Sequence, residues 1–427
     1  MRLVISAYAC APDRGSDHGV GWMWVTEAHR LGHRVWAFAS TVHRSAILRA
    51  CAADPSLAGI DWWFPEVAGW PLTPGVEPEW ERSYNLLWQR EAARQVKALL
   101  RRERIDAIHH ASWAGIRAPT FLGGLGPPLI LGPVGGGETS PAGLRDAIGM
   151  RGRLLEAVRD LSNRTITLNP IVRPGLQQAE VIFAATPETE RLFRGRLARK
   201  LRVFSQLALP PAEPPPPRPA RAGPPRLIYA GRLLYWKGVH IALRTFARVA
   251  ERHPGSHLTI VGGGRELARL RAAAQSLKVA DSVRFVARLP QAELFGLYDR
   301  HDLMLFPSLH DSGGMAALEA LSRGLPVLCL DLGGPGLLVT DECGVVIPTA
   351  GRGTDDVAAA MSAAIDGIVA DPGRLEALSA GALRRAAEYS ARSRAQALYQ
   401  QVAEVIGAPS ATPPAMAHRP AEAAERV

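Results

Sequence analysis

The sequence predicts an α/β protein built from two facing Rossmann-like domains. Residues 1–205 and residues 226–390 each alternate short apolar runs with helical patterns, which is typical of parallel sheets covered by helices on both faces. Between them, residues 206–225 are rich in proline. Such a run cannot continue a helix or a central strand, so a stiff exposed linker is expected there. The 427 residues are enough for about two to three domains.

The first domain opens with a strand, a loop, a helix and a second strand. Residues 3–8 are apolar, residues 10–21 hold Pro, Asp and three Gly as a loop, and residues 22–31 have helical spacing before the apolar run 35–39. This alternation predicts a βαβ unit and hence a parallel sheet. Further buried strands are expected at residues 105–109, 129–131 and 181–185.

After the linker the alternation restarts. Strands are expected at residues 227–230, 258–261, 283–286, 303–306 and 326–330, and helices at residues 239–251, 266–277 and 314–322. Residues 391–407 look helical and are expected to pack back on the N-terminal domain, followed by a disordered tail at 408–427 that is rich in Ala and Pro. Two such domains place a ligand between them, at the carboxyl ends of their strands.

Composition narrows the class of protein. No apolar run reaches the roughly 18 to 20 residues that span a bilayer, and the N-terminus enters a strand without a signal-peptide pattern. The four cysteines show no paired spacing, which indicates reduced thiols and a cytoplasmic protein. The formal net charge of +10 attracts anions, but no nucleic-acid-binding motif accompanies it, so no nucleic-acid partner is expected.

A first cluster of candidate residues follows the strand at 227–230. Arg232 and Lys237 lie five residues apart on a strand-to-helix turn that is bounded by Gly231 and Gly238. Two cations on such a turn can converge on one diphosphate, while the helix adds its amides and its dipole. The alternative is that both are solvated surface cations.

A second cluster follows the strand at 303–306. It reads Asp311-Ser-Gly-Gly-Met-Ala-Ala-Leu-Glu319 and opens a helix. Exposed amides in the segment Gly313, Gly314, Met315 and Ala316 can bind an anion or sugar hydroxyls. Glu319 can accept hydrogen bonds from a vicinal diol such as ribose. Alternatively, Glu319 is a buried structural acid, although an unpaired one would be costly.

With these motifs the chain resembles the retaining glycosyltransferases of family 4, which have the GT-B architecture. The resemblance rests on Arg232 and Lys237, on the acid-x7-acid pair Asp311 and Glu319, and on the following Gly-Gly loop at 333–334. It is strong across residues 227–348. It is weaker but collinear in the N-terminal half, through the segment Gly19-Val20-Gly21.

The resemblance implies a role for each matching residue. Arg232 and Lys237 would bind the donor diphosphate and Glu319 its ribose, and these residues with Asp311 are the catalytic candidates. The loop at 313–316 would face the donor sugar together with Asp311, and the strand end at 285–288 would face the base. The residues for which contacts with the donor are implied are Gly19, Gly21, Gly313, Gly314, Met315, Ala316, Phe285 and Arg288.

Two positions depart from the family pattern. Asp311 stands where Glu is usual, and the segment 131–138 is a Gly-rich turn where many members carry a His. Glu138 at the end of that turn, and His110 at the end of another N-domain strand, are candidates for contacts with the acceptor or the sugar. Each has a structural alternative, as a surface carboxylate or an internal histidine.

The expected activity is transfer of a sugar from a nucleotide-diphosphate sugar to a hydroxyl of a glycan or glycolipid, with retention of configuration implied by the resemblance. No Asp-x-Asp pair or His/Cys/Asp cluster has metal-ligand spacing, so no metal and no cofactor besides the sugar nucleotide is expected. The rivals are a nucleotide-sugar epimerase of similar architecture and a catalytically inactive nucleotide-sugar-binding protein. The Arg-rich amphipathic stretch 151–159 either contacts anionic lipid peripherally or covers the core as a solvated helix.

Overall fold

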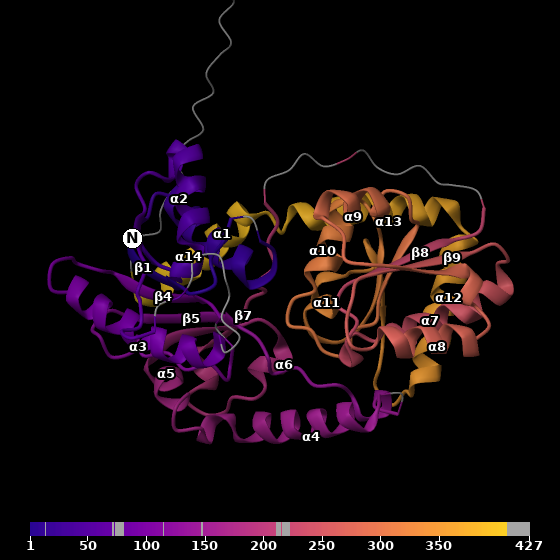
Figure 1. Cartoon of the computed structure of the whole chain (residues 1–427), viewed down its shortest axis with the longest axis horizontal. Helices are drawn as coiled ribbons and strands as arrows, with labels where there is room; N and C mark the ends of the chain where they lie inside the picture. The colour runs from indigo at the N-terminus through magenta and orange to yellow at the C-terminus, as the bar shows by residue number, and fades with distance from the viewer. Residues whose placement is uncertain are drawn as a thin grey trace, which may run out of the picture.

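In the computed structural model, the described residues are 1–12, 14–70, 72, 81–113, 115–146, 148–210, 215 and 223–407. They form two β-sheets, each flanked by helices, that lie side by side (Figure 1). The predicted α/β fold with two facing Rossmann-like sheets is confirmed. The tail expected at 408–427 and most of the linker expected at 206–225 lie outside the described residues.

The first sheet has the strand order β3-β2-β1-β4-β5-β6-β7, and every neighbouring pair is parallel. Its strands are β1 (Arg2–Ala7), β2 (Arg34–Phe38), β3 (Asp61–Trp63), β4 (Ala107–Ser112), β5 (Leu129–Val134), β6 (Ala179–Ala184) and β7 (Leu201–Val203). Its helices are α1 (Ser16–Arg30), α2 (Arg44–Ala53), α3 (Glu81–Leu99), α4 (Met150–Thr165), α5 (Arg173–Gln178) and α6 (Pro187–Glu190).

The second sheet has the order β10-β9-β8-β11-β12-β13, again with parallel neighbours. Its strands are β8 (Arg226–Ala230), β9 (His257–Val261), β10 (Val283–Val286), β11 (Leu303–Phe306), β12 (Val327–Leu330) and β13 (Gly344–Ile347). The remaining helices are α7 (Val239–Arg252), α8 (Leu267–Ser276), α9 (Gln291–Tyr298), α10 (Met315–Ser322), α11 (Gly333–Leu338), α12 (Thr354–Val369), α13 (Pro372–Ala387) and α14 (Ala391–Ile406).

The central strands of both sheets are buried because helices cover the two faces of each sheet. The strands β4, β5, β11 and β12 are buried along their whole length, as expected for parallel strands with helices on either side. One side of the second sheet packs under α7, α8 and α12, and the other under α10 and α13. Burial on both faces favours apolar runs such as β11 and β12, whereas β4 also carries the buried polar residues His109, His110 and Ser112.

Helix α1 corrects one prediction. The loop expected across residues 10–21 ends early, because α1 begins at Ser16 and contains both Gly19 and Gly21. A Cβ on Gly21 would lie 2.0 Å from the carbonyl oxygen of Ala9. The glycines therefore allow α1 to pack closely on the segment that follows β1. From the sequence pattern alone, this packing role could not be distinguished from a role in a donor-binding loop.

The chain crosses between the two halves at two adjacent segments. The amide of Leu209 donates to the carbonyl of Tyr389, and the amide of Ala391 donates back to Leu209, both at 2.8 Å. Leu207, at the start of the expected linker, is buried rather than exposed. Beyond the crossing, α14 packs beside α1 on the first sheet (Figure 1), where the Tyr399 hydroxyl lies 2.9 Å from His109 Nδ1.

Candidate functional site

The carboxyl ends of β8 and β11 define the candidate donor site. These strands are neighbours at the centre of the second sheet, where the strand order changes direction. Ligands of open α/β sheets bind outside the strand ends at such a switch point. The loops that leave the two strands, residues 231–238 and 307–314, carry the two motifs that the sequence singled out.

Lys237 and Asp311 form an ion pair that joins these loops. Their side chains are 14% and 19% exposed, so the pair is largely shielded from water. The Lys237 ammonium also lies 5.7 Å from the centre of the Phe306 ring, and Asp311 Oδ1 lies 3.5 Å from the amide nitrogen of Gly313. Lys237 is therefore not a solvated surface cation.

A left-handed glycine brings the two loops together. Gly238 has φ of 66°, and a Cβ at this position would lie 1.8 Å from the carbonyl oxygen of Pro307. A larger residue would separate the loops. The contact continues where the amide of Leu309 donates to the Trp236 carbonyl at 2.7 Å, and where the Trp236 ring stacks on His310 with centroids 5.5 Å apart.

Arg232 lies at the boundary between the two halves. Its side chain is exposed, and its charge reaches Asp17 in the first turn of α1. Burial raises the pKa of Asp17, although the residue keeps contact with solvent, and the charges of His18 and Arg232 act in the opposite direction. Arg232 and Asp17 therefore interact electrostatically, whereas Gly19 and Gly21 lie further along α1.

The segment 313–316 forms the entry to α10. Gly314 has φ of 94°, and a Cβ there would lie 2.9 Å from Cγ of Pro335. Gly313 is buried, while Met315 and Ala316 are half-buried. The first amides of a helix have no partner within it, and the helix dipole favours an anion at this end. This entry adjoins Asp311 and can therefore supply amides next to the ion pair.

Glu319 lies on α10 and accepts a hydrogen bond from Gln291 Nε2 at 2.7 Å. Burial raises the pKa of the Glu319 carboxyl, and the bond from Gln291 acts in the opposite direction. Of the other two expected donor contacts, Phe285 is half-buried against the core of the second sheet, and Arg288 is exposed. Gln291 is the nearby polar residue that the sequence pattern did not single out.

The two N-domain candidates are enclosed by the protein. Glu138 is 3% exposed and accepts hydrogen bonds from the hydroxyls of Thr186 (2.7 Å), Thr189 (3.0 Å) and Ser312 (2.7 Å). His110 is 1% exposed and its Nε2 lies 3.3 Å from Gln89 Nε2. Glu138 is thus not a surface carboxylate: it joins the first half to the loop after β11 through Ser312.

Burial lowers the pKa of His110 to about 4, and the charge of His109 acts in the same direction. The ring is therefore neutral near pH 7. Together with its burial, this makes His110 an internal histidine and not one that faces an open site.

Glu156 is a buried carboxylate that the sequence analysis missed. From α4 it accepts hydrogen bonds from the Tyr235 hydroxyl and from the Ser140 amide, both at 2.9 Å, and its Oε1 lies 3.0 Å from His310 Nε2. Burial alone would raise the pKa of Glu156, but the contact with His310 and the other hydrogen bonds outweigh it and lower the pKa to about 2. Tyr235 lies two residues before Lys237, and His310 lies directly before Asp311. Glu156 therefore contacts both of the loops that carry the ion pair.

Glu188 was also missed, because it reaches from α6 to the second half of the chain. Its Oε1 accepts a hydrogen bond from the amide of Gly333, the first residue of α11, at 2.8 Å. Its Oε2 is buried and has no hydrogen-bond partner within the described part of the chain. No local motif marks Glu156 or Glu188, since each one's partners in the second half lie far away in the sequence.

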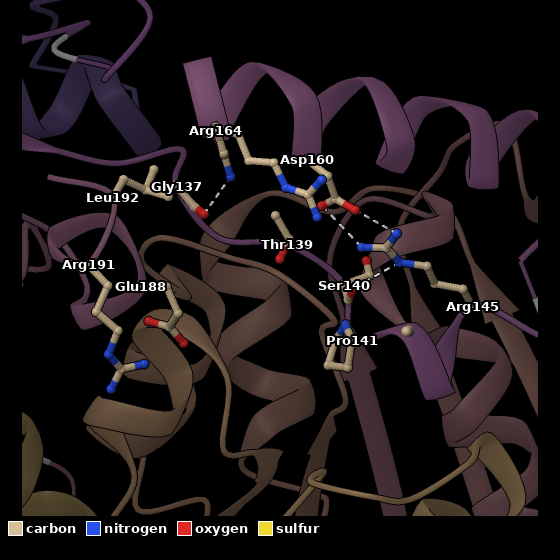
Figure 2. A pocket seen from close by; sticks show the side chains of 12 residues that line it. Gly137, Thr139, Ser140, Pro141, Arg145, Asp160, Arg164, Glu188, Arg191 and Leu192 are labelled. Atoms are coloured by element: carbon tan, nitrogen blue, oxygen red, sulfur yellow. Dashed lines mark hydrogen bonds and ion pairs between the residues drawn. The ribbon is translucent and has the colours of Figure 1, made fainter. Parts of the chain in front are cut away.

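A pocket of about 450 Å³ lies beside these contacts (Figure 2). One wall is the loop that contains Thr139 and Ser140, and α4 and α6 supply the others (Figure 2). Arg145 donates from Nη1 to Asp160 at 2.8 Å. The lining residues are Gly137, Thr139, Ser140, Pro141, Ala142, Arg145, Asp160, Asn163, Arg164, Glu188, Arg191 and Leu192.

In the ranges given above, no group of three His, Cys, Asp or Glu side chains is placed to hold a metal ion. Over the same ranges, no helix combines the length and the apolar character needed to cross a membrane.

Residues 215–385 match the family model described as glycosyl transferases group 1. Glycogen synthase of Mycobacterium tuberculosis (strain CDC 1551 / Oshkosh) is 37% identical over 150 residues, or 35% of this chain and 36% of that protein. D-inositol 3-phosphate glycosyltransferase of Corynebacterium jeikeium (strain K411) is 33% identical over 185 residues, or 42% of this chain and 43% of that protein. The chain thus spans less than half the length of these curated relatives.

Similarity to solved structures extends over the whole fold. Sucrose-phosphate synthase from Thermosynechococcus elongatus aligns with a TM-score of 0.61 and 16% identity, covering 95% of this chain and 99% of that one. The lipopolysaccharide outer core galactosyltransferase WaaB aligns with a TM-score of 0.61 and 14% identity over the same shares. Anabaena Alr3699/HepE in complex with UDP-glucose has a TM-score of 0.58 and 14% identity, covering 95% and 100%. The chain therefore has the GT-B fold, and its C-terminal half resembles the glycosyl transferases of group 1.

Proposed function

We propose that this protein is a glycosyltransferase that moves a sugar from a nucleotide-diphosphate sugar to a hydroxyl of a glycan or glycolipid, with retention of configuration. The observation that carries the proposal is the shielded pair of Lys237 and Asp311 at the switch point of the second sheet. The names of the similar proteins, which are synthases and transferases, favour transfer over epimerisation.

The donor would lie over the loops after β8 and β11. Its diphosphate would be bound by Arg232 and Lys237 together with the first amides of α10, which suit an anion. Glu319 would exchange its bond from Gln291 for bonds from the ribose diol, since a carboxylate accepts but does not donate. HepE has been solved with UDP-glucose, so uridine nucleotides are the first donors to test.

Lys237 would change partners when the donor binds. In the structure its ammonium is neutralised by Asp311. As the bond between sugar and diphosphate breaks, negative charge grows on the leaving group, and cations already in place stabilise it without reorganisation. Asp311, released from the lysine, could accept hydrogen bonds from the donor sugar. With Arg232 and Lys237 neutralising the diphosphate, the reaction needs no metal ion.

The acceptor would occupy the pocket beneath α4. Its polar lining includes Ser140 and Asn163, and Glu188 ties its wall to the donor half through Gly333. The buried Oε2 of Glu188, which has no partner among the described residues, can accept a hydrogen bond from an acceptor hydroxyl. Arg145, Arg164 and Arg191 also line the pocket and suit an acceptor that carries an anionic group.

Release of nucleoside diphosphate from a panel of UDP-, GDP- and ADP-sugars tests this function. We expect release from one donor class to rise when glycan or polyprenyl-phosphate-linked acceptors are added, with label transferred to the acceptor. Conversion of the donor to an epimer without an acceptor would instead indicate an epimerase. Donor binding without turnover, across the acceptor panel, would indicate a catalytically inactive binding protein.

A further inference from the structure

Helix α4 is amphipathic in the reverse of the usual sense, because its polar face is buried and its apolar face is exposed. The exposed fractions of Met150, Leu154, Val158 and Leu161 are 87%, 66%, 58% and 62%. At about 100° per residue these four side chains fall within roughly one quarter of the helix circumference. A core-covering helix would turn this face inward.

The inner face of α4 is polar, and its contacts explain why the helix cannot turn over. Asn163 Nδ2 donates to the Gly137 carbonyl at 2.8 Å, and Arg159 Nη1 donates to the Gly136 carbonyl at 3.1 Å. Glu156 is fully buried beneath Tyr235 and His310. Rotating α4 to bury its apolar residues would break this network and leave Glu156 without partners.

The apolar surface continues beyond the helix. Leu168 and Ile171, which follow α4, are 70% and 54% exposed. Of the ten large apolar side chains that are exposed in the described part of the chain, seven lie between residues 150 and 171. Soluble surfaces rarely gather apolar side chains so densely without a partner. Figure 1 shows α4 along one edge of the molecule, beneath both halves.

Arginines border this apolar surface. Arg151, Arg153 and Arg164 are exposed and project on either side of the apolar stripe by helical spacing. The acidic residues of α4 are occupied elsewhere: Asp160 pairs with Arg145, and Glu156 is buried. The surface is therefore apolar at its centre and cationic at its rim.

We propose that the α4 surface, residues 150–171, docks the protein on an anionic lipid membrane. An apolar stripe suits the acyl region and a cationic rim suits acidic headgroups, which is the pattern of helices that lie in a bilayer interface. A second copy of this chain fits less well. Two-fold pairing of the same surface would bring like-charged rims together without an acidic counterpart.

Docking would also place the pocket at the membrane. Asp160 and Arg164 of α4 line the pocket (Figure 2), while the outer face of the same helix would touch lipid. A lipid-linked acceptor could then enter from the bilayer surface. Membrane binding itself does not depend on the proposed transferase activity, so its test uses no donor and no acceptor.

The test is sedimentation of the full chain with vesicles. We expect binding to phosphatidylglycerol-containing vesicles and little binding to pure phosphatidylcholine. The variant Leu154→Ser/Val158→Ser/Leu161→Ser should reduce the partition coefficient on the order of 10-fold or more. Its matched control is Leu48→Ser, which replaces an exposed leucine of α2 (46% exposed) and should bind normally.

A charge series checks the rim. Arg151→Gln/Arg164→Gln should weaken binding to the anionic vesicles, whereas Arg101→Gln/Arg104→Gln, at exposed positions after α3, should weaken it far less. Because all the replaced side chains are exposed, circular dichroism should show unchanged folding. Failure of the wild type to bind anionic vesicles would overturn the proposal. So would a dimer that the triple serine variant abolishes while vesicle binding persists.

Discussion

Replacing Lys237 with Ala tests the candidate donor site most directly. The change removes the ammonium that pairs with Asp311 and leaves that carboxylate 19% exposed without its partner. Replacing an exposed lysine without contacts would leave both the free energy of unfolding and the turnover nearly unchanged. The shielded ion pair predicts that both will fall.

The expected size of each effect follows from the shielding. Exposed ion pairs contribute up to about 1 kcal/mol, whereas breaking a fully buried pair costs about 3–5 kcal/mol. With side chains 14% and 19% exposed, Lys237→Ala should lower the free energy of unfolding by about 2 kcal/mol. Turnover at saturating donor should fall by on the order of 10²-fold, because a preorganised charge at the leaving group is lost.

The double variant Lys237→Ala/Asp311→Asn separates these two effects. Neutralising Asp311 removes the unpaired charge, so stability in urea should recover by about 1 kcal/mol or more relative to Lys237→Ala. Turnover should stay low, because the cation is still missing. Lys237→Arg should restore stability better than turnover, since a planar guanidinium replaces a compact ammonium. Near-normal turnover in Lys237→Ala, measured at saturating donor and acceptor, would refute the assignment.

Three further predictions follow from the same contacts. Glu156→Gln should lower the free energy of unfolding by about 2–3 kcal/mol at neutral pH. Because the pKa of Glu156 is lowered from 4.5 to about 2, this stabilisation is present above about pH 4.5 and is lost as the pH falls toward 2. A difference between variant and wild type that stays constant in urea titrations from pH 7 to pH 3 would contradict the account. Glu319→Gln should leave stability unchanged or raise it by up to about 1 kcal/mol at neutral pH, because burial raises the pKa of this carboxyl and its ionised form is unfavourable. Calorimetry should show the affinity for nucleoside diphosphate reduced by on the order of 10-fold. Transfer should persist in EDTA, since Arg232 and Lys237 are proposed to neutralise the diphosphate; loss of most of the rate, restored by Mn²⁺ or Mg²⁺, would refute this.

Local pattern predicted five of the six strands of the second sheet, but not β13 or the helices α9, α11, α12 and α13. The apolar runs at 227–230 and 303–306 became β8 and β11, and the helical segment at the C-terminus became α14. Strand and helix periodicity depend on near neighbours, so a single sequence reveals them. The glycine-bounded turns and the spacing from Asp311 to Glu319 are equally local, and they directed attention to the loops that the fold brings together.

Local pattern was less informative where a residue's role depends on distant contacts. The glycines of α1 resembled those of a loop, because the contact that requires a glycine, the approach of α1 to Ala9, is a tertiary contact that the sequence does not show. Glu138 and His110 were placed near the site by their positions at strand ends, but their burial follows from Thr186, Ser312 and Gln89.

The sequence by itself determined the fold class, because parallel strands and helices follow from short-range spacing, and it singled out Arg232 and Lys237 as candidates for binding a diphosphate. Only the tertiary structure decided that Lys237 pairs with Asp311, that Glu156 lies buried beneath the second half, and that the apolar side of α4 faces outward. The helical period of α4 shows two faces but not which one is covered. That choice is made by the buried hydrogen bonds of Glu156 and Asn163, whose partners lie outside the helix.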